Sequence, residues 1–185
     1  KSFVITTDYV GPDRRKDDGR ASSAELFAPP NSLKMKAKDK LTGEAIARKL
    51  DAELKSAREK LCAEKLRRDT FQLCVLWRLM QDALPGKGGA PPELERLCEL
   101  ARATDRRARE IGAAAGLEWC AQLLAAAEGL ALGVDRNASM HLLGHAALSL
   151  HQAFHPEQSA AAQLAEIDAT VAAIRARSLP QAVAV

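Results

Sequence analysis

Four histidines are the side chains in this chain best suited to chemistry. His141 and His145 are four residues apart, as are His151 and His155, so each pair shares one face of a helix. An imidazole can take up a phosphoryl group, and two at this spacing can share a metal ion. A metal would need a third ligand, and no HExxH motif is present, so we expect no metal site. His145 and His141, which lie near Gly144, stay open as phosphoacceptors beside the simpler interpretation as ordinary surface histidines.

The second chemical feature is the segment DYVGPDRR at residues 8–15. Arginine can contact the acceptor edge of guanine in a bidentate way and neutralise phosphate, while a carboxylate can accept from the donor edge of guanine. This pattern suits a planar anionic ligand, but a solvated basic linker is the simpler interpretation, since charge runs are usually only solvated. The candidate nucleotide-binding residues are Tyr9, Asp13, Arg14, Arg15 and Arg20.

Charge is unevenly distributed along the chain. Residues 1–40 carry nine basic and six acidic side chains, which accounts for the whole formal charge of +3. The other 145 residues are balanced, with 18 of each sign, so nothing in the bundle predicts binding to a nucleic acid polymer. The four cysteines form no CxxC pair, which favours reduced thiols in a cytoplasmic protein. No apolar run is long enough to span a membrane. Because the chain begins with Lys1, we expect that residues once preceded it.

The elements that must position these residues are helices. Alanine and leucine dominate the apolar residues and only 4% of the chain is aromatic, which favours helix over strand. We predict an all-α protein, an up-and-down antiparallel helix bundle with an extended, mostly irregular N-terminal arm. The expected divisions are a basic arm over residues 1–31, the bundle over 32–179 and a frayed tail over 180–185.

Proline, glycine and apolar periodicity set the expected element boundaries. In the arm we expect one short strand near residues 3–6, then turns at 11–13 and 17–19. The expected helices cover residues 32–41, 44–66, 71–84, 93–115, 117–132, 135–154 and 156–178. Gly43 is expected to end the helix over 32–41, and Gly116 to end or kink the helix over 93–115. Residues 67–70 are either a break or a solvated turn of one long helix.

The YVGPDRR element, followed by the PNSLKMKA segment at residues 30–37, resembles the region after the receiver domain in a family of alphaproteobacterial response-regulator-like proteins. The resemblance implies an arginine-rich tail, which in some members binds cyclic-di-GMP, followed by a histidine phosphotransfer (HPt)-like helical domain. Residues 104–112 resemble the phosphoacceptor helix of that domain, with Thr104 where the family has histidine. A threonine hydroxyl cannot replace the imidazole as nucleophile without a base of its own.

The resemblance therefore implies a non-enzymatic two-component signalling module, a degenerate phosphotransfer domain that docks a receiver domain or a histidine kinase. Its expected partner-binding surface is an exposed helix face with Thr104, Arg106, Arg107 and Arg109, where the arginines would meet the acidic pocket of a receiver. Three alternatives stay open: cyclic-di-GMP binding by the arm, active phosphotransfer through His145 or His141, and a structural bundle that forms a homodimer. No catalytic residue and no other cofactor are expected.

Overall fold

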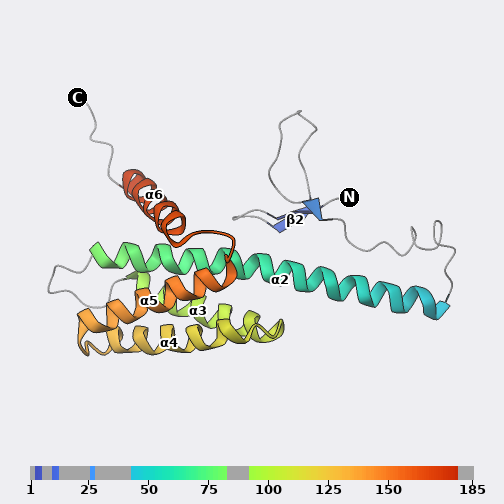
Figure 1. Ribbon diagram of the computed structural model, residues 1–185, viewed down its shortest axis with the longest axis horizontal. Coiled ribbons are helices and arrows are strands. Elements are labelled where there is room, and N and C mark those ends of the chain that lie inside the picture. The colour runs from blue at the N-terminus through green and yellow to red at the C-terminus, as the bar shows by residue number, and fades with distance from the viewer. Residues whose placement is uncertain (1–2, 6–9, 13–25, 28–42, 83–91, 179–185) are drawn as a thin grey trace, which may run out of the picture. The chain divides into compact units, whose positions relative to one another are not determined.

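Five helices form the main part of the described chain. A computed structural model describes residues 3–5, 10–12, 26–27, 43–82 and 92–178. The helices are α2 (Gly43–Asp82), α3 (Pro92–Glu110), α4 (Ala114–Ala131), α5 (Arg136–Phe154) and α6 (Ala160–Ser178). Figure 1 shows their succession. This confirms the predicted all-α helix bundle.

The chain forms two units, residues 1–64 and 65–185, and the boundary between them falls inside α2. The first unit contains a small antiparallel sheet with the strand order β2-β1-β3. Strand β1 (Phe3–Ile5) lies at the predicted place, and it pairs with β2 (Val10–Pro12) and β3 (Leu26–Phe27). The expected turn at residues 11–13 is wrong at Gly11 and Pro12, which are strand residues. The helix predicted at 32–41 and the tail at 180–185 lie outside the described residues.

In the second unit, α3 packs against α4, and α4 packs against α5. Short connections, residues 111–113 and 132–135, make these neighbours antiparallel, as predicted. The core is built from the apolar faces of all five helices, and its fully buried members include Leu73, Leu97, Leu123, Leu150 and Ile167. Small residues let α4 and α5 approach closely: a Cβ on Gly129 would lie 2.8 Å from Oγ of Ser139.

Residues 67–70 do not break the helix, because α2 continues through them as the one long helix of the second alternative, but this turn is not solvated throughout. Asp69 and Thr70 are only 1% and 0% exposed. The charged pattern ArgArgAspThr suggested solvent, yet its last two members lie on the face of α2 that turns to the core. Gly43 is the first residue of α2 and has a φ of +54, while the helix that it is expected to end lies outside the described residues.

The end of α3 is set by Gly112 and not by Gly116. Gly112 has a φ of +68, a left-handed conformation that glycine adopts at no steric cost and that ends helices. Gly116 lies in the first turn of α4, where a Cβ would come within 3.0 Å of the Phe154 ring. Asp135 caps α5 by accepting from the backbone N–H of Ala138 at 3.1 Å, and α6 begins at Ala160 rather than at Pro156.

The four cysteines lie in helices and form no disulfide. Cys74 donates to the backbone carbonyl of Ala147 at 3.3 Å. Burial raises the pKa of the Cys120 thiol to about 12 and that of Cys74 further still. These two thiols behave as small apolar groups. Within the described residues, none of the helices combines the length and apolar character that crossing a bilayer would require.

Candidate functional site

The structure places Thr104 in the interior of the bundle, with no exposed surface. Its hydroxyl donates to the backbone carbonyl of Leu100, one turn earlier in α3, at 2.8 Å. The expectation that Thr104 belongs to an exposed partner-binding face is therefore wrong. The apolar stripe of α3, Leu94, Leu97 and Ala101, continues through Thr104 to Ala108, so this position points to the core.

The three predicted arginines differ in their surroundings. Arg107 forms an ion pair with Asp69 of α2, whose side chain is 2% exposed. Burial raises the pKa of the Asp69 carboxyl, while the charges of Arg107 and Arg68 oppose the rise. Arg109 forms a bidentate pair with Asp105 at 2.9 and 3.0 Å. Arg106 is exposed. Two of the three charges are thus already neutralised by carboxylates within the bundle, so they do not form the expected continuous basic patch.

His141 and His145 lie on the exposed surface of α5. The His145 ring meets the Trp119 ring of α4 edge-on, with 5.4 Å between the centroids. Gly144, between them in sequence, faces Trp77 of α2 so closely that a Cβ would overlap the indole ring. Trp77 is held there by its Nε1–H, which donates to the carbonyl of Met140 at 3.3 Å. The glycine therefore serves the close packing of α5 against α2, on the buried side of the helix, while both imidazoles stay exposed.

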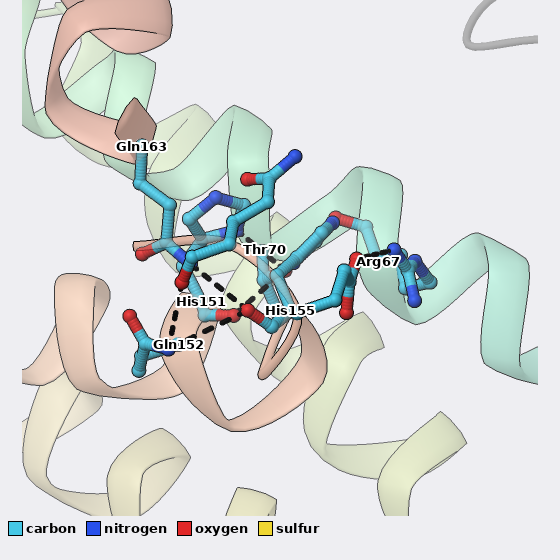
Figure 2. Close-up of polar contacts among 8 residues, drawn as sticks. Arg67, Thr70, His151, Gln152, His155 and Gln163 are labelled. Carbon is cyan, nitrogen blue, oxygen red and sulfur yellow. Dashed lines mark hydrogen bonds and ion pairs between the residues drawn. The ribbon is translucent and has the colours of Figure 1, made fainter. Parts of the chain in front are cut away.

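The other two histidines, His151 and His155, form a buried polar cluster that the sequence did not single out as a site. They are 1% and 9% exposed, and their ring centroids are 4.1 Å apart. The cluster joins the end of α5 to α2 and to the start of α6 (Figure 2). In the described ranges, no three histidine, cysteine or carboxylate side chains gather as the ligands of a metal would.

Hydrogen bonds fix which nitrogen of each ring carries the proton. The Thr70 hydroxyl donates to the carbonyl of Arg67 at 2.9 Å, so its oxygen accepts from Nδ1 of His151 at 3.3 Å. Nδ1 of His155 contacts the carbonyl of His151 at 3.1 Å, and a carbonyl can only accept. Both rings therefore carry the proton on Nδ1. Nε2 of His151 is left as a buried acceptor without a hydrogen-bond partner.

These surroundings keep both imidazoles neutral. Burial, reinforced by the charges that His155 and Arg67 would bring near, lowers the pKa of His151 to about 4. Burial is also the main cause that lowers the pKa of His155, with Arg67 acting in the same direction. Arg67 is itself paired with Glu157, an exposed carboxylate just after α5. A ring that is neutral and buried is unsuited to phosphoryl transfer.

Two glutamines complete the cluster. Gln163 of α6 and Gln152 of α5 both donate to the carbonyl of His155, at 3.1 and 3.4 Å. Gln152 also donates to the carbonyl of Gln158 at 3.3 Å. The turn between α5 and α6 is therefore held by side-chain amides from both helices. No periodicity in the sequence indicates such contacts, because they depend on where the turn places one carbonyl group.

The predicted nucleotide-binding residues, Tyr9, Asp13, Arg14, Arg15 and Arg20, lie outside the described residues, and cyclic-di-GMP binding stays a prediction. The chain matches no protein-family model, no curated protein and no solved structure. Any functional conclusion therefore depends on the residues themselves.

Proposed function

We propose that the bundle is a non-enzymatic docking module of two-component signalling, and that it docks a receiver domain through the first half of α5 and the turn before it. The observation that carries the proposal is the exposure of Leu132, Val134 and Leu142, which are 79%, 61% and 60% exposed. Exposed large apolar side chains mark a surface that another protein covers where they gather in one patch, and these three lie within eleven residues of the chain. We call these three residues the apolar face.

Two imidazoles stand beside the apolar face. His141 and His145 are one helical turn apart, and Leu142 follows the first of them directly. A neutral imidazole offers one donor and one acceptor, so this pair can meet polar groups at the rim of an interface whose centre is apolar. The resemblance of the YVGPDRR and PNSLKMKA segments to the response-regulator family supports a receiver domain as the class of partner. The proposal replaces the surface around Thr104 with this one.

The test is a titration of purified receiver domains from the same genome, one at a time, each with and without the phosphate mimic beryllofluoride. We expect one of them to bind with a micromolar Kd. Leu142→Ser is expected to weaken that binding at least tenfold, since truncating an anchor at the centre of an interface costs more than about 1.4 kcal/mol. Leu164→Ser is the matched control, because Leu164 is also exposed, at 40%, but lies on α6.

The proposal fails if no receiver binds or if Leu142→Ser and Leu164→Ser bind equally well. Binding of a histidine kinase alone would also overturn it, because the proposal commits to the receiver. Thermal unfolding of each variant excludes a loss of folded protein as the cause of weaker binding.

Active phosphotransfer is the second candidate, and the exposure of both His141 and His145 favours it. In this reaction a ring nitrogen would attack the phosphorus of an aspartyl phosphate, forming a P–N bond while the P–O bond to the departing carboxylate breaks. We rank it second because, within the described residues, no hydrogen bond orients either ring. Transfer of acid-labile phosphate from a labelled receiver, lost in His145→Gln or in His141→Gln, would establish it.

A further inference from the structure

A cavity of about 580 Å³ opens between α4, α5 and α6, on a part of the bundle that the proposed docking face does not use. Its apolar walls are Trp119, Leu148, Pro156 and Leu164, and its polar residues are Ser149, Gln152 and Gln163. Every lining residue is uncharged. The volume lies within the range of about 300–1,000 Å³ that is typical of small-molecule sites.

The polar wall of the cavity is built by the glutamine contacts at the α5–α6 turn. Because the carbonyl of His155 can only accept, the NH₂ groups of Gln152 and Gln163 must face it. Their carboxamide oxygens then point the other way, and Figure 2 shows both on one side of the cluster, away from the His151 ring. Gln163 is only 2% exposed as a residue, so its position is set by packing as well as by this bond.

The two carboxamide oxygens accept no hydrogen bond within the described part of the chain. Each has its amide nitrogen committed to the backbone, which prevents the group from rotating to present a donor instead. The cavity therefore offers fixed acceptors next to an indole ring. A molecule that fills it must supply donors, because a polar group left unpaired on burial costs free energy.

The uncharged lining decides the charge of the occupant. The cavity is open on one side, and its lining offers no counter-charge to a charged group, so a neutral occupant is favoured over a charged one. The Trp119 ring favours a flat partner that can stack on it or meet it edge-on. Together these features select a neutral, flat, mostly apolar molecule with N–H or O–H groups on one edge.

We propose that this cavity binds a small neutral aromatic molecule whose N–H or O–H groups donate to the carboxamide oxygens of Gln152 and Gln163. The ligand stacks or packs edge-on against Trp119 and covers Leu148 and Leu164. The proposal does not depend on the docking of a receiver, since Leu132, Val134 and Leu142 do not line the cavity.

Indole and benzofuran test the proposal on the unmodified chain, because they share one shape and only indole carries an N–H donor. Each is titrated into ¹⁵N-labelled protein, and the indole N–H signal of Trp119 is followed by NMR. We expect saturable shifts at Trp119 and in the side-chain amides of Gln152 and Gln163. Benzofuran should bind about fivefold more weakly, the difference that one hydrogen bond makes. The signal of Trp77, buried elsewhere, serves as the internal reference.

Variants then locate the acceptors. Gln152→Met should reduce the preference for indole over benzofuran to less than twofold, whereas Gln122→Met, an exposed position on α4 outside the cavity, should leave it unchanged. Indole-3-acetate, which is anionic, should cause no saturable shift at the same concentrations. The proposal is overturned if indole causes no saturable shift up to its solubility limit, if benzofuran binds as tightly, or if the anion binds better.

Discussion

Helix α5 and its C-cap residue His155 carry two histidine pairs with the same spacing in opposite surroundings. His141 and His145 lie on the surface, while His151 and His155 are packed against α2 and the start of α6. Ten residues separate corresponding members of the two pairs. At about 100° per residue this rotates the second pair by about 80° around the helix axis relative to the first. That rotation is enough to carry the second pair from the exposed side of α5 to the buried side.

The difference teaches that spacing decides which residues share a face, and packing decides what that face can do. The outer pair, His141 and His145, has solvent around it and one aromatic neighbour, Trp119, so it is available to a partner. The inner pair, His151 and His155, donates its Nδ1–H groups to the Thr70 hydroxyl and to a backbone carbonyl, and burial keeps both rings neutral. The same residue type is thus a surface group in one half of the helix and a structural group in the other.

The largest expected effect concerns the close packing of the outer half of α5. Gly144→Ala places a methyl group within the ring of Trp77, which cannot swing away without losing its bond to Met140. We expect a loss of about 4 kcal/mol in the free energy of unfolding, above the usual range for over-packing. Urea denaturation followed by circular dichroism measures it.

Trp77→Leu provides the control for this prediction. In that background the added methyl group meets a smaller side chain, so Gly144→Ala should cost about 1 kcal/mol or less. Gly129→Ala gives a milder comparison, because the atom it meets is the Ser139 hydroxyl, which can rotate away at the loss of one hydrogen bond to the carbonyl of Val134. Equal costs of Gly144→Ala in both backgrounds would show that the glycine does not serve packing against Trp77.

The second largest expected effect is a loss of stability in acid, which comes from the inner pair. The pKa of His151 is about 4 in the folded chain, against an ordinary value of 6.5. The unfolded chain therefore binds more protons between these values, so stability falls as the pH falls from 6.5 towards 4. Between pH 7 and pH 5 we expect the free energy of unfolding to drop by about 2 kcal/mol from this group alone. Lowered proton affinity at His155 adds to the fall.

Urea denaturation at several pH values measures this fall, and the His151→Gln variant should show a shallower slope. An NMR titration of the His151 ring in the unmodified chain gives a second reading that does not require a stable variant. A ring that protonates near pH 6.5 in the folded state would contradict the burial argument. The charged side chains that act on the pair are Arg67, Glu157 and Glu166.

Much of the fold could be predicted from periodicity, because apolar residues at helical spacing and glycine or proline at the ends determine where helices form. The helices predicted near 93–115, 117–132 and 135–154 agree with α3, α4 and α5 to within five residues at each end. The joining of residues 44–66 and 71–84 into α2 was not settled, because Arg67 and Arg68 look solvated in the sequence. Their neighbours Asp69 and Thr70 are buried only because Arg107 and His151 come from other helices to meet them.

The candidate site was harder to predict than the fold. Thr104 seemed exposed by analogy with a phosphoacceptor, but its hydroxyl finds an acceptor within its own helix and can therefore be buried. The cluster around His151 depends on contacts between residues 81 positions apart in the chain. No local pattern encodes such a contact. The only indication of this contact in the sequence is a threonine and a histidine on the apolar faces of two separate helices.

The smallest effect tests whether that contact fixes the inner pair. Thr70→Val keeps the shape of the side chain but removes the oxygen that accepts from Nδ1 of His151. The N–H is then buried without a partner, and we expect a loss of about 1 kcal/mol in the free energy of unfolding. Thr170→Val is the matched control, since the Thr170 hydroxyl bonds only to the carbonyl of Glu166, one turn earlier in its own helix. That variant should change stability by less than about 0.5 kcal/mol, because such bonds within a helix add little. If the two variants cost the same, the bond across the bundle does no more than a bond within a helix, and the inner pair would owe its position to apolar packing alone.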